Sequence, residues 1–216
     1  MILSELGLAI WVSLKTSGLA ALAASLLAVP AALFLAGREF RGKRLILLVN
    51  QTWMAAPTVV IGLFFYYLLG RRGLLGGLGL LYTQTAMVVG QVVLILPLIL
   101  GFAYTALRQV DKRARLTALT LGATRRQAGR VVLRDARFAL LTAVLAGFAR
   151  AISEVGIAMM LGGNIRSATR NITTSIALET AKGEFQNGVV LGLILLAITL
   201  GTNALVQAGL RTRDGE

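Results

Sequence analysis

The stretch that decides the fold is LGLLYTQTAMVVGQVVLILPLILGFAYTAL, residues 78–107, which contains no charged residue. A helix needs about 20 predominantly apolar residues to cross the hydrocarbon core of a bilayer, and this stretch exceeds that length. Its apolar residues form an unbroken run. A strand of a transmembrane barrel would instead alternate apolar and polar side chains over about 10 residues. The stretch therefore predicts a membrane-spanning α-helix.

Four further apolar runs of similar length flank this one, at about 14–36, 45–69, 138–161 and 188–210. The whole chain is 56% hydrophobic and only 14% charged, whereas soluble domains are about 25% charged. The first run is too long for the core of a signal peptide, so we interpret it as a retained helix. The sequence thus predicts an all-α membrane protein with about five transmembrane helices, organised as one domain over residues 1–216.

Composition also argues against several functions. The chain has no histidine and no cysteine, so it lacks the commonest general base, the commonest metal ligand and any thiol chemistry. The usual catalytic and metal-binding residues are therefore missing, but composition alone does not exclude an enzyme. The net charge of +13 does not indicate a nucleic-acid partner, because most of the basic residues flank apolar segments.

The segment GREFRGKR, residues 37–44, nearly matches a phosphate-binding loop. Its last position holds Arg44 where that loop needs a serine or threonine, and no soluble-domain strand precedes it. We interpret the segment as a basic turn that sets membrane topology. If transport is driven by ATP, a different subunit must therefore bind the nucleotide.

The distribution of lysine and arginine predicts the orientation of the chain. Fifteen of the 22 lie in residues 37–44, in residues 108–137 and after residue 210, whereas six lie in the other connections. Cytoplasmic segments carry the excess of positive charge. The sequence therefore predicts an N-terminus outside, a C-terminus inside and a cytoplasmic segment at 108–137.

Arg150 and Glu154 lie four residues apart within the fourth apolar run, so they would share one face of a helix. A charge near mid-membrane costs about 2.5–3.5 kcal/mol on insertion scales. The two residues could form an internal ion pair that fixes helix packing, or they could line or gate a solute path. The two interpretations are compatible.

The segment TRNITTSIALET, residues 169–180, places several hydroxyl groups beside Arg166 and Arg170. Hydroxyls, amides and cations suit an anion that must lose its water shell. The same composition is also typical of an ordinary external loop capped by asparagine and threonine. The residues alone leave both interpretations open.

The most charged stretch, TALTLGATRRQAGRVVLRDAR at residues 117–137, lies between two apolar runs. Its pattern predicts a helix over 108–121 that ends at Gly122, because glycine tolerates the left-handed conformation at a helix C-terminus. A second helix is expected to begin after Ala123 and Thr124 and to run into the fourth span. Such a structured, basic protrusion indicates docking with a partner or a helix lying on the membrane surface.

This stretch resembles the cytoplasmic motif of permease subunits of ATP-binding-cassette importers. Gly122 matches the glycine of that motif and Ala118 its second alanine, whereas Leu116 replaces its glutamate. The residues expected to contact the ATPase are Ala118, Leu121, Gly122, Ala123 and Thr124. The segment ISEVGIAMMLGGNIRSATRNITTSIALETAKGEF, residues 152–185, resembles the tungstate-type permeases and, more loosely, the molybdate permeases.

The resemblance implies a type I importer permease in a prokaryotic inner membrane, paired with a second copy to form the translocation path. Its expected partners are an external oxyanion-binding protein and two ATPase subunits, which would hold ATP and magnesium. The resemblance therefore implies that this chain itself is a non-catalytic subunit, with no catalytic residues, no metal site and no cofactor. The residues expected to form the path or its gate are Arg150, Ser153, Glu154, Gly156, Thr173, Thr174 and Ser175. Glu154 would repel a dianion unless it is paired, so we assign it to the gate structure together with Arg150 and not to direct ligation of the substrate.

Two other functions are compatible with a helical membrane protein. An ion-coupled secondary transporter or channel would act without an ATPase, but such folds usually show internal repeats, and none is visible in this sequence. A membrane scaffold would bind partners without transporting a solute.

Overall fold

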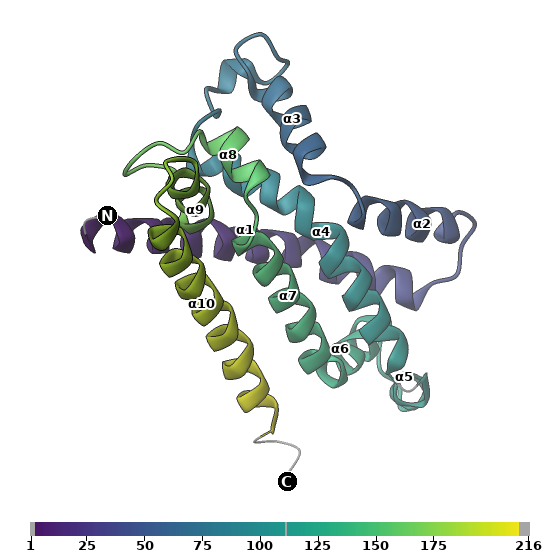
Figure 1. The fold of residues 1–216 in the computed structure, drawn as a ribbon. Helices are drawn as coiled ribbons and strands as arrows, with labels where there is room; N and C mark the ends of the chain where they lie inside the picture. The colour runs from purple at the N-terminus through teal and green to yellow at the C-terminus, as the bar shows by residue number, and fades with distance from the viewer. Residues whose placement is uncertain (1–2, 111, 212–216) are drawn as a thin grey trace.

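The computed structural model describes residues 3–110 and 112–211, and all the regular secondary structure within them is helical (Figure 1). The elements, in chain order, are α1 (Leu3–Gly37), α2 (Lys43–Met54), α3 (Thr58–Leu69), the 3-10 turn η1 (Gly76–Leu78), α4 (Gln84–Gln109), α5 (Lys112–Thr120), α6 (Arg125–Asp135), α7 (Arg137–Ile152), α8 (Gly156–Gly162), α9 (Ile172–Ala181) and α10 (Phe185–Arg211).

Three helices, α1, α4 and α10, are long and apolar enough to span a membrane on their own. The predicted spans 45–69 and 138–161 are not continuous helices: α2 and α3 meet at 97°, and α7 and α8 at 61°. Counting each bent pair as one span gives the five spans that the sequence predicted. The first break follows from Pro57, which cannot donate a backbone hydrogen bond and disfavours helical geometry in the residue before it.

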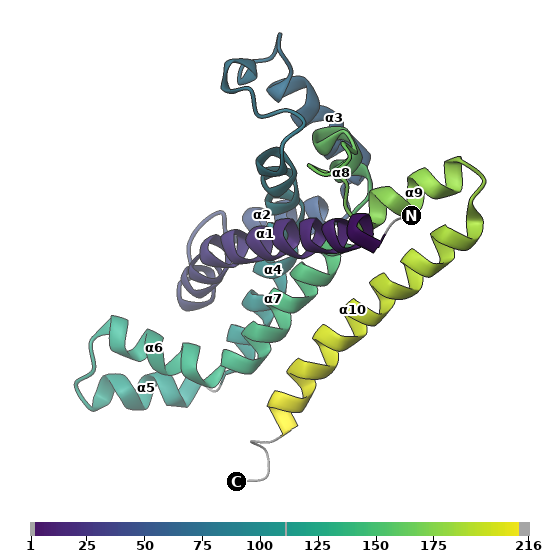
Figure 2. The same ribbon diagram turned by 90° about the vertical axis from the view of Figure 1, so that its left-hand side faces the viewer.

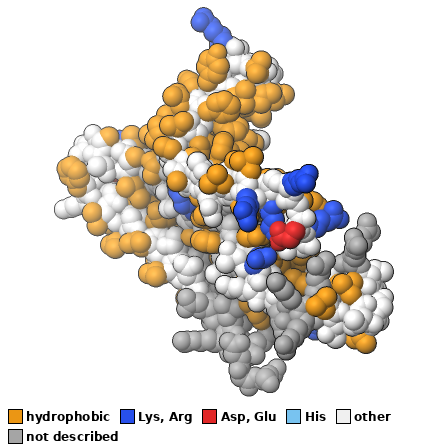
Figure 3. Space-filling model, turned by 90° about the vertical axis from the view of Figure 1, so that its right-hand side faces the viewer, with side chains coloured by type: hydrophobic (Ala, Val, Ile, Leu, Met, Phe, Trp, Pro, Cys, Tyr) orange, Lys and Arg blue, Asp and Glu red, His pale blue; other side chains and the backbone are white. Residues whose placement is uncertain are grey.

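The centre of the molecule is the packing of α1 across α4 and α7 (Figure 1). One side of α1 carries alanines at four-residue intervals, Ala20, Ala24, Ala28 and Ala32, each with no exposed surface. Small side chains let two helix backbones approach closely, which favours helix association in a bilayer. By contrast, α2 and α3 expose most of their apolar side chains, and apolar groups cover much of the face shown in Figure 3.

The short helix α8 is packed between α3 and α4 at two glycines. A Cβ atom on Gly62 would lie 2.8 Å from the sulfur of Met160, and a Cβ on Gly90 would lie 2.5 Å from Cγ2 of Ile157 and 2.6 Å from Cδ1 of Leu161. Ile157 and Leu161 are both completely buried. The absence of a side chain at Gly90 is therefore what allows α8 to reach α4.

We expect Gly90→Ala to destabilise the protein, although alanine is the better helix former. The added methyl group would displace Ile157 and Leu161, and overpacking of this kind costs about 1–3 kcal/mol. Gly192→Ala on α10 is the matched control, because a Cβ there meets nothing within 4 Å. Thermal unfolding in detergent should show a lower midpoint for Gly90→Ala and an unchanged or higher one for Gly192→Ala. Equal midpoints would contradict this account of the packing.

The segment predicted to be a cytoplasmic helix–turn–helix is the hairpin of α5 and α6, which projects from the bundle (Figure 2). Two boundaries differ from the prediction. Arg108 belongs to α4, which continues to Gln109, and α6 does not run directly into the fourth span, because a turn at Ala136 separates it from α7.

The base of the hairpin packs against the bundle. Val132 of α6 and Ala136 share a buried apolar cluster with Ala32 of α1 and with Ala103 and Leu107 of α4. A force applied to the hairpin would therefore be transmitted to α1 and α4 through a packed contact.

Candidate functional site

The break between α7 and α8 carries the ion pair that the sequence predicted. Nη1 of Arg150 lies 2.8 Å from Oε2 of Glu154. The two residues are not on one continuous helix, since α7 ends at Ile152 and Glu154 lies in the turn that follows. The Glu154 side chain is 4% exposed, whereas that of Arg150 is 39% exposed. The pair therefore consists of a buried carboxylate held by a cation that solvent can still reach.

Glu154 connects three helices. Its second carboxylate oxygen, Oε1, accepts a hydrogen bond of 3.2 Å from the backbone N–H of Ile157, in the first turn of α8. Its backbone carbonyl accepts a bond of 2.9 Å from the hydroxyl of Thr173 on α9. The orphan N–H groups at a helix N-terminus favour a negative charge, so Glu154 stabilises the start of α8 while it pairs with α7.

The N-terminus of α9 is closed by a capping box. The side chain of Asn171 accepts from the N–H of Thr174 at 2.8 Å, and the Thr174 hydroxyl accepts from the N–H of Asn171 at 3.0 Å. Ser175 donates to the Asn171 carbonyl at 2.7 Å, and the N–H of Ile172 donates to the hydroxyl of Ser13 on α1. The capping bonds order the start of α9, and the bond from Ile172 to Ser13 joins it to α1.

The residues predicted for the path are therefore brought together, but they are not equally accessible. Thr173, Thr174 and Ser175 are all buried and use their hydroxyls within the chain. Ser153 is exposed and bonds the carbonyls of Ala149 and Arg150 in its own helix. In this conformation the Thr173 hydroxyl supports the turn at Glu154, whereas the hydroxyls of Thr174 and Ser175 bond the Asn171 carbonyl at the start of α9.

Gly156 lies where the two broken spans meet. A Cβ atom on it would be 3.2 Å from Oε1 of Glu154 and 3.5 Å from the hydroxyl of Thr58, the first residue of α3. Our sequence analysis did not identify Thr58 as a site residue. Its place directly after Pro57, at a break in an apolar run, was the available signal.

Gln91 of α4 is a further polar group beside this turn. Its Nε2 donates to the carbonyl of Ala151, near the end of α7, at 3.2 Å. The residue is completely buried, and its Oε1 has no hydrogen-bond partner among the described residues. A buried acceptor without a donor is costly. The Gln91 side chain therefore holds the end of α7 through its Nε2, while its buried Oε1 carries an energetic penalty.

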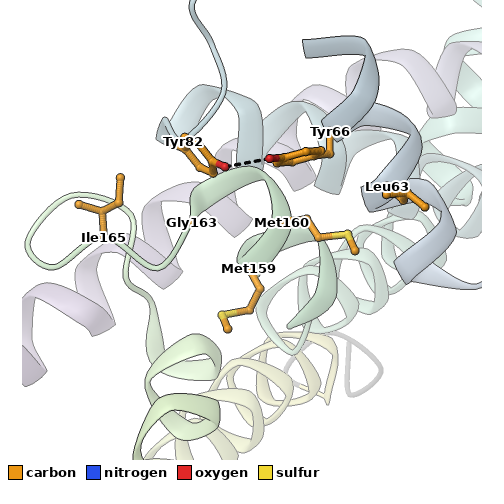
Figure 4. Close-up of a pocket in the computed structure, with 7 residues that line it drawn as sticks. All are labelled: Leu63, Tyr66, Tyr82, Met159, Met160, Gly163 and Ile165. Carbon is orange, nitrogen blue, oxygen red and sulfur yellow. Dashed lines mark hydrogen bonds between the residues drawn. The ribbon is translucent and has the colours of Figure 1, made fainter. Parts of the chain in front are cut away.

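A cavity of about 560 Å³ opens between α3, α8 and the segment before α4 (Figure 4). The hydroxyls of Tyr66 and Tyr82 are 3.1 Å apart across it, and this hydrogen bond raises the pKa of the Tyr82 phenol above 10.0. Its lining contains no cation: Leu63, Tyr66, Tyr82, Met159, Met160, Gly163 and Ile165. The apolar lining does not suit an oxyanion.

The tip of the α5–α6 hairpin combines a fixed turn with an exposed apolar side chain. Gly122 has φ +86°, and the N–H of Ala123 bonds the carbonyl of Ala118 at 3.0 Å. Thr124 caps α6 in a reciprocal pair of bonds with Gln127. Leu121 is 83% exposed. The residues predicted for ATPase contact therefore lie together at one accessible turn.

Comparison with known proteins identifies the family of this architecture. The family described as "Binding-protein-dependent transport system inner membrane component" matches residues 28–210, which include both broken spans, the hairpin and α9. The chain belongs to this family. The resemblance to permeases seen in the sequence is thereby confirmed, and members of the permease family are membrane subunits that do not themselves catalyse a reaction.

Individual permeases cover nearly the whole chain. It is 40% identical over 94% of its length to a probable anion ABC transporter permease of Haloferax volcanii, which it covers to 88%. It is 39% identical over 92% of its length to the tungstate uptake system permease TupB of Peptoclostridium acidaminophilum, which it covers to 87%. It is 31% identical over 97% of its length to the molybdenum transport system permease ModB of Azotobacter vinelandii, which it covers completely.

A solved structure also shares the permease fold. The crystal structure of an amino acid ABC transporter with histidines superposes with a TM-score of 0.69 over 97% of this chain and 94% of that chain, at 17% sequence identity. The match confirms the helical fold.

Proposed function

We propose that this chain is the membrane permease subunit of an importer for tungstate, with molybdate as the second candidate oxyanion. The observation that carries the proposal is the 39% identity to a tungstate uptake permease over 92% of the chain, compared with 31% to a molybdenum permease. ATP, with magnesium, is hydrolysed on separate ATPase subunits, and this chain supplies the path and needs no cofactor.

The proposed assembly contains two copies of this chain in a prokaryotic inner membrane, two ATPase subunits inside and an oxyanion-binding protein outside. Segment 108–137 couples the permease to the ATPase through the α5–α6 tip. Support comes from the exposed Leu121 and from the packing of Val132 against α1 and α4. Movement of the tip can thereby be passed to the spans.

The gate is proposed to be the turn at Glu154. This turn joins α7, α8 and α9 through three separate interactions. A shift of α7 would therefore displace α8 and α9. The Thr173 hydroxyl becomes available to an oxyanion only when its bonds to Glu154 and Asn171 rearrange, and the hydroxyls of Thr174 and Ser175 only when their bonds to the Asn171 carbonyl do. In this conformation Arg150 neutralises the Glu154 carboxylate, and separation of the pair would leave a negative charge that repels a dianion.

Uptake by the reconstituted importer tests the substrate. Proteoliposomes containing this chain and its ATPase subunit, with the binding protein outside and ATP inside, should accumulate tungstate, and excess molybdate should compete more weakly. No accumulation without ATP is expected. ATP-independent uptake by this chain alone would identify a secondary transporter instead, and accumulation of neither oxyanion would contradict the proposed substrate.

The chain lacks cysteine, so single introduced cysteines can report the proposed orientation, with the N-terminus outside and the C-terminus inside. Leu74 is 92% exposed in the connection between α3 and α4, and Leu121 is 83% exposed at the hairpin tip. We expect a membrane-impermeant maleimide to label Leu74→Cys in intact cells and Leu121→Cys only after the membrane is opened. The reverse labelling pattern would show that the chain has the opposite orientation in the membrane.

A further inference from the structure

The turn between α1 and α2 is fixed onto α4 by a buried lysine. Nζ of Lys43 donates to Oε1 of Glu39 at 2.8 Å and to the carbonyl of Arg38 at 3.1 Å, and it lies 5.5 Å from the centre of the Tyr104 ring. Lys43 is 5% exposed. Nη1 of Arg108, near the end of α4, lies 3.6 Å from the same carboxylate oxygen. The turn and the end of α4 therefore form one structural unit.

This unit presents a concentration of positive charge. Four arginines from the turn, α2 and α4 are exposed around Glu39: Arg38, Arg41, Arg44 and Arg108. Figure 3 shows such lysine and arginine side chains gathered around an acidic one. Within residues 37–44 and 108–110, Glu39 is the only carboxylate in the sequence. The positive charges of the arginines on the described surface therefore outnumber the one carboxylate, Glu39, that could neutralise them.

An apolar surface begins immediately beside these arginines. The residues of α2 that follow Arg44 expose large hydrophobic side chains: Leu45 63%, Ile46 45%, Leu48 59% and Val49 54%. An occupant of the whole surface must be anionic at the turn and apolar along the helix. Arginine guanidinium groups hydrogen-bond phosphate oxygens with well-matched geometry.

We propose that this surface, defined by Arg38, Arg41, Arg44, Arg108 and the exposed apolar side chains of α2, is a binding site for an anionic phospholipid. The phosphate group would be held by the arginines and the acyl chains would lie along α2. With the orientation proposed above, on which this inference rests, the surface lies at the cytoplasmic side, where basic surfaces between membrane helices are suited to lipid head groups. The buried Lys43 holds the turn in place before the lipid arrives, so the backbone that carries Arg38 and Arg41 needs little ordering on binding.

Lipid binding to the purified full chain tests the proposal. The chain in neutral detergent would be titrated with phosphatidylglycerol or phosphatidylcholine, with bound lipid counted by native mass spectrometry and thermal unfolding followed in parallel. The test variant is Arg38→Gln/Arg41→Gln/Arg44→Gln/Arg108→Gln, which leaves Lys43 in place. The matched control is Arg71→Gln/Arg72→Gln, which removes two exposed arginines between α3 and α4.

We expect phosphatidylglycerol to bind the wild type and the control with equal affinity, and the test variant roughly tenfold or more weakly. Phosphatidylcholine should bind all three alike, and raised salt should weaken only phosphatidylglycerol binding. Equal phosphatidylglycerol binding by all three proteins would overturn the proposal. So would unchanged lipid binding combined with loss of ATPase capture, which would make this surface a protein interface.

Misfolding of the test variant would not obstruct the comparison. The pairs Arg38→Gln/Arg41→Gln and Arg44→Gln/Arg108→Gln divide the surface between the turn and the two helices, and each should lose part of the selectivity for phosphatidylglycerol. Full selectivity in both folded pairs would overturn the proposal.

Discussion

Leu121→Asp is expected to abolish capture of the ATPase subunit while the membrane domain stays folded. Leu121 is 83% exposed at the turn between α5 and α6, so no packing within the chain depends on it. An apolar anchor at the centre of an interface is worth about 2–4 kcal/mol, which corresponds to a loss of affinity of roughly 30- to 1,000-fold. A buried charge would add its desolvation cost.

The measurement is affinity purification of the permease from its native membrane in gentle detergent, with bound proteins identified by mass spectrometry. Leu74→Asp is the control, because it places the same charge at a 92% exposed leucine outside the hairpin. We expect the ATPase subunit with the wild type and Leu74→Asp but not with Leu121→Asp. An ATPase retained by Leu121→Asp would refute the docking assignment.

Gly122→Asp probes the same turn by a different mechanism. A Cβ on Gly122 would meet nothing within 4 Å, so no clash is expected. The strain comes from φ +86°, a conformation that costs a residue with a side chain about 1 kcal/mol. The turn would be distorted together with its neighbours Ala118, Ala123 and Thr124, and ATPase capture should weaken without loss of membrane insertion.

The second large effect is expected at the ion pair. Arg150→Ala should lower the free energy of unfolding by roughly 1–3 kcal/mol, because it leaves the buried Glu154 carboxylate without its cation. The loss should be smaller than the 3–5 kcal/mol typical of fully buried pairs, since Arg150 is 39% exposed. Glu154→Gln should cost less than Arg150→Ala, because the amide oxygen can still accept from Ile157 and Arg150 can reach solvent.

Thermal unfolding of the two single variants and of Arg150→Ala/Glu154→Gln measures the coupling. The double variant should recover most of the stability lost in Arg150→Ala, since no charge is then left buried. Arg108→Ala is the control, because its partner Glu39 is 77% exposed and should lose almost nothing. A stability of Arg150→Ala equal to that of the wild type would show that the pair does not support the turn.

Transport by the same variants separates the gate from simple packing. If the pair belongs to the gate, tungstate uptake should fall in the double variant even where its stability has recovered. If the pair only stabilises packing, uptake should recover together with stability. The wild type, the two single variants and the double variant are compared in the same proteoliposome assay.

The sequence by itself determined the membrane class, the approximate positions of the spans and the motif that identified the family. These features depend on local sequence. The length of an apolar run shows whether it can cross a bilayer, and Gly122 indicates the end of a helix because glycine alone readily adopts a left-handed backbone conformation. The spacing of Arg150 and Glu154 likewise indicated an ion pair, although the helix whose face they were expected to share ends at Ile152.

Only the tertiary structure decided how these parts are used. The break after Ile152 separates the fourth apolar run into α7 and α8, and contacts of α8 with α3 and α4 stabilise this bent path, whereas Pro57 already marks the break after Met54 in the sequence. The fit of α8 depends on Gly62 and Gly90, which lie far from it in sequence. The hydroxyls of Thr173 and Ser175 are occupied by partners that packing supplies, and composition alone could not distinguish such hydroxyls from free ones.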